Sequence, residues 1–387
     1  FIMNNYMNQA KLINNDERLG FIKCSNQALK VSTGKYIVRL DADDWLEENA
    51  IEIMVSNLEA DKSIAFVYPD YNEVSEKGDF LRTIRLRPKG FILDIPAHGA
   101  CTMYRKSVLK SVGGYDERNV CQDGYDLWLR LAKNNKFKHI NLPLFFYRQS
   151  DGSVSSDKQS IIKQRRLIKS RFIDDNNICP PKTLVYIPVR PDSLALTKIK
   201  DKFLVELTIK NLKNVQNEID VVVSSSDNGL LSVCYSKHSI EMHHRHESRE
   251  LNNVSVEKNV SEYLDTSEFK YDQVLILHYN YPFLFASAID EMIDTKSIYG
   301  SETVIAVTSK KESRYDISVD NRLIQRCRTT FKKDREGIFS ESGAMYLLSH
   351  DAAKSQRVLT ENTSFILLSK EESFQVESKF DLSLVSG

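Results

Sequence analysis

A turn, a short apolar strand and an acidic loop follow one another in the segment Gly34-Lys35-Tyr36-Ile37-Val38-Arg39-Leu40-Asp41-Ala42-Asp43-Asp44. The run from Tyr36 to Leu40 is short and mostly apolar, which predicts a strand. Apolar residues at helical spacing between Leu46 and Leu58 predict that a helix follows, with Asp44 as its N-cap. Asp41 and Asp43 therefore stand at the carboxyl end of a strand, where open α/β sheets bind their ligands.

Two carboxylates one residue apart in such a place suit a hard divalent cation. Mg²⁺ or Mn²⁺ binds one or two carboxylates together with phosphate oxygens, and it can neutralise a diphosphate as it departs from a sugar. The segment thus predicts a metal site at Asp41 and Asp43. The alternative is a solvated loop in which Asp44 only caps a helix.

The rest of the chain predicts two α/β domains. Its 387 residues exceed what one hydrophobic core usually organises. In the first half, strands are predicted at 64–68 and 142–147, and helices at 105–111 and from Asp123 onward. In the second half, strands are predicted at 183–188, 219–224, 273–279, 303–308 and 344–348, with helices such as 204–215 and 286–293 between them. This alternation favours mostly parallel sheets. We expect a first domain at 1–150, a basic helix and linker at 151–181, and a second domain at 182–387.

Charge and cysteine content limit the classes of partner and the cellular compartment that we expect for the protein. Lys plus Arg and Asp plus Glu both number 53, so no overall field attracts nucleic acid, and we expect no nucleic-acid partner. Six scattered cysteines without a CxxC pair favour a reducing cytoplasm. No apolar run approaches the ~20 residues of a membrane span. The basic amphipathic helix at 158–172 has two interpretations: it packs on the first domain, or it attaches the protein to the inner face of the membrane.

Several motifs of the first half resemble those of family 2 glycosyltransferases, which have the GT-A fold. The segment from Gly34 to Leu46 resembles the family's metal-binding segment, and Gly20 and Asn26 fall where the family usually has Gly and Asn. Ser25 occupies a position that is more often Arg. Further resemblance lies in His98-Gly99-Ala100, Met103-Tyr104-Arg105, Gly113-Gly114-Tyr115-Asp116-Glu117 and Gln122-Asp123-Gly124-Tyr125-Asp126-Leu127-Trp128-Leu129-Arg130. Together these segments cover about residues 10 to 150.

This resemblance implies roles for individual residues. Asp43 and Asp41 would hold Mg²⁺ or Mn²⁺, and Asp123 would be the general base that accepts a proton from the acceptor hydroxyl. The family's Glu-Asp motif is Gln122-Asp123 here, which makes Asp126 the second candidate for the base. The donor and acceptor site that the resemblance implies includes Asp44, His98, Gly99 and Trp128.

Three of these residues also have a purely structural interpretation. In this interpretation Asp123 is a helix cap without a catalytic role, Trp128 is a residue of the hydrophobic core, and His98 is an ordinary loop histidine. Family members usually begin with a strand and a Pro-Thr-Tyr-Asn-like turn, then carry an acidic pair that contacts the nucleoside. Neither feature precedes Asp41, so we expect that the chain as given, which starts at Phe1, is truncated within its nucleotide-binding half.

The second half resembles the CMP-sialic acid synthetase (acylneuraminate cytidylyltransferase) family over residues 183 to 385. That family cradles CTP in a basic, glycine-rich loop. The matching positions are Arg190, Ser193, Lys202 and, in the run from Leu275 to Leu284, Asn280. In place of the paired glycines stand Pro191 and Asp192, and Gln375 replaces one carboxylate of the family's metal site. CTP or a CMP-sugar is therefore an expected partner, whereas cytidylyltransferase activity is doubtful.

These resemblances predict an inverting, metal-dependent glycosyltransferase with two tandem nucleotide-sugar transferase-type domains, GT-A and Rossmann-like. It would move a sugar from a nucleotide-sugar donor to a glycan acceptor during assembly of a bacterial surface polysaccharide. Two alternatives stay open for the second half: a CMP-nonulosonic acid synthetase, or a non-catalytic module that binds nucleotide or a partner. The run His243-His244-Arg245-His246 does not predict zinc, because adjacent residues of an extended segment point to opposite faces.

Overall fold

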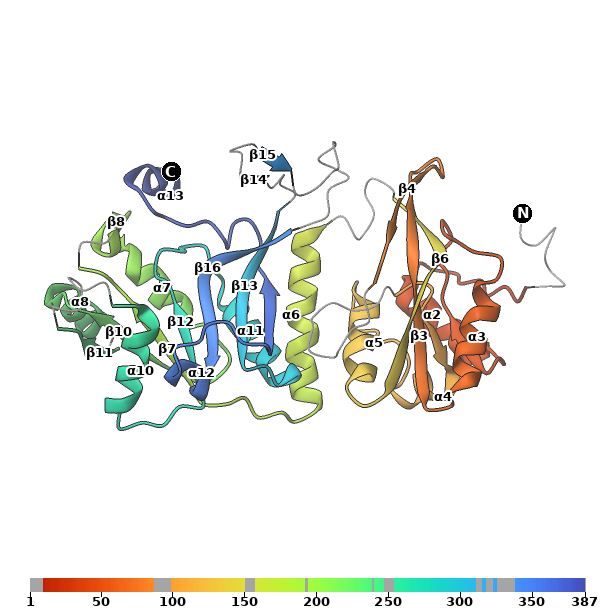
Figure 1. The fold of residues 1–387 in the computed structure, drawn as a ribbon, viewed down its shortest axis with the longest axis horizontal. Coiled ribbons are helices and arrows are strands. Elements are labelled where there is room, and N and C mark those ends of the chain that lie inside the picture. Colours follow the sequence, from red (N-terminus) through yellow and green to blue (C-terminus); the bar gives the residue numbers. More distant parts are fainter. Residues whose placement is uncertain are drawn as a thin grey trace. The chain divides into compact units, whose positions relative to one another are not determined.

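The computed structural model describes residues 10–86, 99–149, 157–191, 194–238, 240–246, 254–310, 315–317, 323–325 and 338–386. These residues form two compact units, which divide between Ile168 and Lys169 inside helix α6 (Lys158–Asp175). Each unit has a central sheet with helices on its faces (Figure 1). The α/β fold class predicted from the sequence is confirmed.

The sheet of the first unit is mixed. Its strands are β1 (Tyr36–Val38), β2 (Trp45–Leu46), β3 (Ile64–Val74), β4 (Phe80–Ile84), β5 (Met103–Arg105) and β6 (Lys136–Arg148). The order is β1-β5-β3-β6-β2, and β4 pairs with β3. Only β3 and β6 are parallel among the described strands of this sheet. The predicted mostly parallel sheet is thus wrong for this unit; β4, for example, returns from β3 through a short turn at Gly78, and short connections give antiparallel pairs.

Helices cover both faces of this sheet. They are α2 (Phe21–Val31), α3 (Ala50–Ala60), α4 (Lys106–Ser111) and α5 (Asp123–Ala132). Because neighbours in a strand point to opposite faces, Phe66 and Tyr68 of β3 pack in a cluster with α2, α4 and α5, whereas Val67 packs in one with α3. The sheet therefore has a separate core on each face.

The helix predicted after Asp44 begins later than expected. Asn49 is the N-cap of α3, and Trp45 and Leu46 instead form strand β2 against β6. The Trp45 ring stacks on that of Phe146 with 4.9 Å between centroids. Pairing with a distant strand has overridden the local helical pattern, so Asp44 is not a helix cap.

The second unit has a seven-stranded sheet with the order β11-β10-β7-β12-β16-β13-β17. Strands β11, β10, β7 and β12 are parallel, β16 is antiparallel to both neighbours, and β13 and β17 are parallel. The prediction of a mostly parallel sheet holds here. The strands of this unit are β7 (Thr183–Pro188), β8 (Lys198–Ile199), β9 (Lys202–Phe203), β10 (Ile219–Ser225), β11 (Glu241–His244), β12 (Gln273–Leu277), β13 (Thr303–Lys310), β14 (Tyr315–Ile317), β15 (Leu323–Gln325), β16 (Ile338–Ser349) and β17 (Thr363–Leu367).

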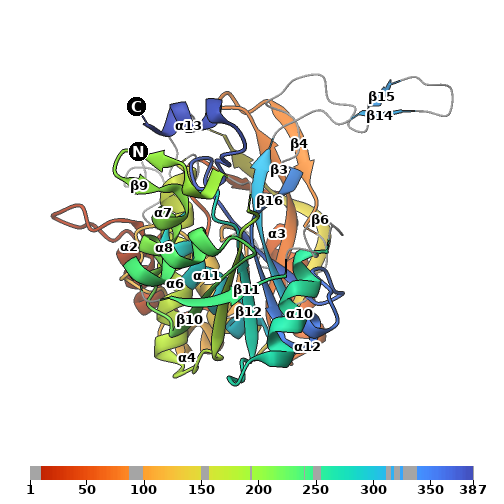
Figure 2. The same cartoon turned by 90° about the vertical axis from the view of Figure 1, so that its left-hand side faces the viewer.

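Two helical layers sandwich this sheet, as Figure 2 shows. Val185 and Ile187 of β7 belong to the core that includes α7, α8 and α11, whereas Leu184 and Tyr186 belong to the core that includes α10 and α12. Burial on both faces explains the continuous apolar run of this strand. The helices of this unit are α7 (Leu204–Leu212), α8 (Asn228–His238), α10 (Val256–Thr266), α11 (Ala286–Tyr299), α12 (His350–Lys354) and α13 (Lys379–Ser386), with a 3-10 turn at Leu194–Leu196.

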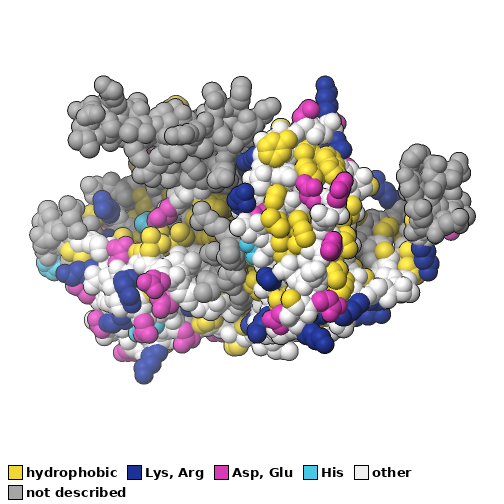
Figure 3. All heavy atoms as spheres, turned by 45° about the vertical axis from the view of Figure 1, so that its right-hand side comes forward, with side chains coloured by type: hydrophobic (Ala, Val, Ile, Leu, Met, Phe, Trp, Pro, Cys, Tyr) yellow, Lys and Arg dark blue, Asp and Glu magenta, His cyan; other side chains and the backbone are white. Residues whose placement is uncertain are grey.

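Helix length, burial of α6 and exposed apolar side chains are the features that concern attachment to a membrane. No helix in the described part of the chain is long and apolar enough to span a bilayer. In α6, the apolar residues Ile162, Ile168 and Phe172 are buried, which favours a packed helix over one that lies on a membrane. Apolar side chains do gather on the forward surface of the first unit in Figure 3. The exposed apolar residues of the first unit include Phe80 and Leu81 of β4.

Candidate functional site

The predicted metal ligands lie on the loop between β1 and β2. Asp41 is half-buried and Asp43 is exposed. Their carboxylates are hard oxygen ligands of the kind that Mg²⁺ or Mn²⁺ binds. The described residues contain no cluster of three or more candidate metal ligands. A Mg²⁺ or Mn²⁺ ion held by one or two carboxylates takes its other ligands from substrate phosphates and water.

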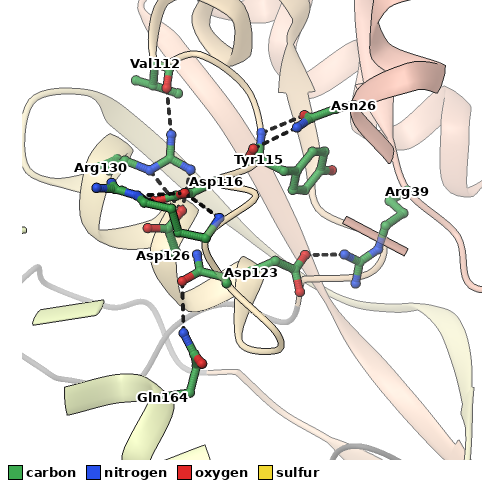
Figure 4. A network of polar contacts seen from close by, with 11 residues as sticks. Asn26, Arg39, Val112, Tyr115, Asp116, Asp123, Asp126, Arg130 and Gln164 are labelled. Carbon is green, nitrogen blue, oxygen red and sulfur yellow. Dashed lines mark hydrogen bonds and ion pairs between the residues drawn. The ribbon is translucent and has the colours of Figure 1, made fainter. Parts of the chain in front are cut away.

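Arg39 connects this loop to the start of α5 (Figure 4). Its Nη1 forms an ion pair and hydrogen bond with Oδ2 of Asp123. Its Nε lies 3.1 Å from Oδ1 of Asp41, close enough for an ion pair but without hydrogen-bond geometry. Burial raises the pKa of Asp41, the positive charge of Arg39 lowers it, and the charges of Asp123 and Asp43 raise it. One guanidinium therefore faces both a predicted metal ligand and the predicted base.

Asp123 is the first residue of α5 and is buried. The preceding residue, Gln122, has a left-handed backbone with φ of 62°, and its side chain does not cap the helix. The carboxylate of Asp123 points instead to Arg39, as Figure 4 shows. No described residue donates a hydrogen bond to its Oδ1. This geometry does not support the interpretation of Asp123 as a mere helix cap.

Asp126, the second candidate for the base, has a different environment. Arg130 donates from Nε to its Oδ2 over 2.9 Å, and Nη1 of Arg130 donates to the carbonyl of Val112 over 2.7 Å. Burial raises the pKa of Asp126, and Arg130 lowers it. Asp126 therefore helps to fix α5 to the end of α4, and it does not contact Arg39.

Asn26 holds the Gly-Gly-Tyr-Asp-Glu element in place. Its side chain donates to the carbonyl of Tyr115 over 2.8 Å and accepts the backbone N–H of Tyr115 over 3.0 Å. Gly114 has a positive φ of 77°, and a Cβ atom there would lie 2.8 Å from Oδ1 of Asn26. Glycine is required at this position for both reasons.

Two glycine backbones touch beside the Arg39–Asp123 pair. A Cβ atom on Gly124 would lie 2.7 Å from Cα of Gly99, and one on Gly99 would lie 3.3 Å from Nη2 of Arg39. The N–H of Cys101 also donates to the carbonyl of Arg39 over 2.9 Å. The predicted binding residue Gly99 therefore lies at this site, on the segment that follows His98. His98 itself lies outside the described residues.

The carboxylate of Asp44 is bound by the backbone at the end of β6. Its Oδ1 accepts the backbone N–H of Arg148 over 2.9 Å, and the residue is only 9% exposed. Burial raises its pKa from 3.8 to about 6. This contact supports the loop, and contact of Asp44 with the donor or acceptor stays a prediction.

Trp128 packs in the core between α5 and the sheet. It is 3% exposed, and its ring centroid lies 4.8 Å from that of Phe137 and 5.9 Å from that of Phe66. These contacts favour its structural interpretation as a core residue of α5, and its contact with donor or acceptor stays a prediction.

Two arginines at this site were missed by sequence reasoning. Arg39 follows an apolar strand directly, and a charged residue at that place is the one signal that could have drawn attention to it. Arg148 ends β6, and its Nε donates to the backbone carbonyl of Asp43 over 2.9 Å. The contacts of Arg39 and Arg148 join residues that are far apart in the sequence, so no local residue spacing predicts them.

In the second unit, the carboxyl ends of β7, β10 and β12 meet at one edge of the sheet. Arg190 follows β7 and is exposed, and Asn280 follows β12. The side chain of Asn280 donates to the carbonyl of Val376 over 3.2 Å, and its own carbonyl accepts the N–H of Val376 over 2.9 Å. Lys202 lies in β9, and Ser193 lies outside the described residues.

The histidine run begins on β11 and joins a polar network. Nδ1 of His243 lies 2.9 Å from Oγ of Ser224 and 3.2 Å from the hydroxyl of Tyr186, and that hydroxyl donates to Ser224 over 2.6 Å. Ser224 is completely buried at the end of β10. His243 thus stabilises the pairing of neighbouring strands.

Comparison with known proteins defines the class of the first unit. Residues 2–113 match the model of glycosyl transferase family 2. This part of the chain is therefore a family 2 glycosyltransferase domain, as its motifs suggest. The match includes the loop with Asp41 and Asp43 and ends before Asp123.

Curated relatives match part of the chain. Hyaluronan synthase of Pasteurella multocida is 27% identical over 149 residues, which are 38% of this chain and 15% of the relative. The UDP-Glc:alpha-D-GlcNAc-diphosphoundecaprenol beta-1,3-glucosyltransferases WfgD and WfaP of Escherichia coli are 26% and 31% identical over 172 and 169 residues. Those matches cover 43% and 41% of this chain and 66% and 63% of the relatives. The chain thus spans only part of the length of each relative.

Solved structures also resemble part of the chain. A CMP:2-keto-3-deoxy-manno-octonic acid synthetase has a TM-score of 0.40 and 12% identity, covering 53% of this chain and 97% of that one. A 4-diphosphocytidyl-2C-methyl-D-erythritol synthase from Anaerococcus prevotii has a TM-score of 0.42 and 11% identity, covering 53% and 94%.

Proposed function

We propose that the protein transfers a sugar from a nucleotide-sugar donor to a hydroxyl group of a glycan acceptor, with Mg²⁺ or Mn²⁺ held by Asp41 and Asp43. The observation that carries the proposal is the bridge of Arg39 between Asp41 and Asp123. Arg39 contacts two acidic groups from segments more than eighty residues apart, and one of them, Asp41, lies within the family 2 match at residues 2–113, which supports the proposal. The names of the curated relatives support a role in assembly of a bacterial surface polysaccharide.

In this mechanism, Asp123 accepts the proton of the acceptor hydroxyl while the hydroxyl oxygen attacks the anomeric carbon. The bond between that carbon and the diphosphate breaks, and its electron pair stays with the diphosphate oxygen. When bound, the metal ion neutralises the charge that develops there. Asp41 and Asp43 would hold that ion. Attack from the face opposite the diphosphate inverts the configuration of the sugar.

Release of UDP tests this proposal. The full chain is incubated with Mn²⁺, an oligosaccharide acceptor and each of a set of UDP-hexoses, UDP-N-acetylhexosamines and UDP-hexuronates, beginning with the UDP-glucose that two relatives use. We expect Asp43→Asn to abolish transfer and Glu48→Gln, at an exposed carboxylate in the turn before α3, to retain it. Wild-type transfer by Asp43→Asn in EDTA would contradict the metal assignment.

For the second unit we propose binding of a cytidine nucleotide without efficient CMP-sugar synthesis. Arg190 is exposed at the carboxyl end of β7, at the sheet edge where Asn280 follows β12. Pro191, next to Arg190, offers no backbone N–H to a phosphate. Gln375 supplies no carboxylate beside Val376, which is bonded to Asn280. These features support binding more than catalysis.

Pyrophosphate release separates this proposal from its alternatives. The full chain is supplied with CTP, Mg²⁺ and several nonulosonic acids, and binding of CTP is measured by calorimetry. We expect binding with little or no pyrophosphate. Turnover near ~1 per second, ordinary for an enzyme, would identify a CMP-nonulosonic acid synthetase. Absence of CTP binding would identify a module for another partner.

A further inference from the structure

We infer that Arg39 is a positioning residue, which fixes one oxygen of Asp123 so that the other faces the acceptor hydroxyl, and which affects turnover only through that carboxylate. The inference rests on the proposed function, because it takes Asp123 as the proton acceptor. It assigns a role to a side chain that lies outside the acidic motifs.

The guanidinium of Arg39 is confined from several directions. It lies over the ring of Phe21 in α2, with 5.2 Å between Cζ and the ring centroid. Gly99 approaches its Nη2 so closely that a Cβ atom there would be 3.3 Å away. The backbone of Arg39 is fixed by the N–H of Cys101. With a side chain only 17% exposed, Arg39 has little freedom to leave Asp123.

The two carboxylates at the site favour a forked cation over a point charge. A guanidinium carries its N–H donors on a rigid plane, so Nη1 can bind Asp123 while Nε faces Asp41. An ammonium group has three donors but no rigid plane and a flexible stem, so it would hold the carboxylate of Asp123 less firmly in one orientation. Removal of the cation would leave the buried carboxylate of Asp123 without an opposite charge, a costly arrangement.

The backbone of Asp123 is fixed as well, so its remaining freedom is the rotation of the carboxylate. Gln122 enters α5 with a left-handed backbone, and Gly124 lies directly against Gly99. Because Arg39 engages Oδ2, Oδ1 is the oxygen left for the substrate. A base must lie within hydrogen-bond reach of the proton that it accepts, so loss of this orientation should slow the chemical step and spare donor binding.

A double-mutant cycle tests the inference. Wild type, Arg39→Gln, Asp123→Asn and the double variant are compared by kcat and donor KM, with Mn²⁺ and the UDP-sugar that gives the fastest UDP release. We expect Arg39→Gln alone to lower kcat by about 10²-fold with donor KM within about threefold, and Arg39→Lys to recover part of that loss. In the Asp123→Asn background, the same change should alter kcat by less than about threefold, because residues that act as a unit are not additive.

Several results would overturn the inference, and they differ from failure of the proposed function. Equal losses of kcat from Arg39→Gln in both backgrounds, or an effect mainly on donor KM, would show that Arg39 does not act through Asp123. Near-normal kcat of Asp123→Asn would instead contradict the proposed base. Arg118→Gln, at an exposed arginine of the same unit, is the control and should leave kcat unchanged.

Folding is followed by tryptophan emission, since both tryptophans, Trp45 and Trp128, belong to the first unit. If Arg39→Gln does not fold, Arg39→Lys and its combination with Asp123→Asn provide the same comparison. A loss of kcat from Arg39→Lys that disappears in the Asp123→Asn background supports the inference. A loss that persists there overturns it.

Discussion

The side chain of Arg148 holds the backbone of Asp43: its Nε donates to the Asp43 carbonyl over 2.9 Å. Its Nη1 donates to the carbonyl of Glu76 over 2.6 Å, and the guanidinium lies over the Trp45 ring at 5.2 Å from the centroid. One residue at the end of β6 therefore ties the proposed metal-binding loop to β2 and to the turn before β4.

Arg148→Met should weaken the response to metal. Loss of groups that orient metal ligands typically costs 10- to 100-fold in affinity. We expect the Mn²⁺ concentration for half-maximal UDP release to rise by about 10-fold, with a smaller change of kcat at saturating Mn²⁺. A Mn²⁺ titration measures this, with Lys77→Met, at an exposed lysine in the turn before β4, as the control. An unchanged titration curve for Arg148→Met would show that the loop keeps its shape without this contact.

Asp123→Asn and Asp126→Asn should affect different properties. Loss of a general base lowers turnover by about 10² to 10⁴, so Asp123→Asn should lose kcat to that extent while donor KM changes little. Asp126 is paired with Arg130, so Asp126→Asn should mainly destabilise the first unit and lower kcat by less than about 10-fold. The checks are steady-state kinetics and thermal unfolding followed by tryptophan emission. A larger kcat loss at Asp126 than at Asp123 would transfer the role of base to Asp126.

Gly124→Ala should disturb both stability and turnover. The added Cβ atom would meet the backbone of Gly99 at 2.7 Å, and backbone cannot move aside as a flexible side chain can. Overpacking of this kind costs about 1 to 3 kcal/mol, and it would displace Asp123 from Arg39. Urea unfolding followed by tryptophan emission, together with kcat, measures the effect. An unchanged urea midpoint and an unchanged kcat for Gly124→Ala would refute the prediction.

Asp294 should make the stability of the second unit depend on pH. Burial raises its pKa from 3.8 to about 7, Asn217 lowers it by a hydrogen bond, and the charge of Asp290 raises it. Because the folded pKa exceeds the unfolded one, this group contributes its full stability below about pH 4, and the contribution is lost as pH rises through about 7. Asp294→Asn cannot ionise, so its stability relative to wild type should increase by a few kcal/mol between pH 4 and pH 8.

Hydrogen exchange in α11 as a function of pH measures this difference. Asp265→Asn, at an exposed carboxylate of the same unit, serves as the control and should follow the wild type. Parallel pH curves for wild type and Asp294→Asn would mean that Asp294 is ionised in the folded protein without cost.

Local sequence was sufficient for features that depend on short-range pattern. The apolar run before Asp41 did form β1, the acidic start of α5 was placed correctly, and the strand at 183–188 is buried on both faces as its composition indicates. The metal ligands and the base were proposed from motif resemblance, and their roles stay predictions.

Long-range contacts explain what the sequence could not predict. Arg39 and Asp123 are 84 residues apart, and Asp44 and Arg148 are 104 apart, so no periodicity links them. The residues after Asp44 have a helical pattern, but Trp45 and Leu46 form strand β2 instead. Pairing of β2 with β6 is a tertiary interaction that outweighs the local helical propensity. Trp128 had two interpretations because a wide aromatic ring suits a core and a sugar platform equally until its neighbours are known.

Helix α6 determines where a protein fragment that carries the second unit should begin. Lys169 is completely buried, and its ammonium donates to Glu291 and to Thr295, each over 2.9 Å. A protein fragment that starts at Pro181, where the sequence places a linker, would lose this ammonium together with the buried side chains of Phe172 and Ile173. Deletion of this part of α6 would expose the surface of α11 around Glu291 and Thr295, which favours aggregation on expression. A fragment meant to carry the second unit should therefore begin upstream of Lys169.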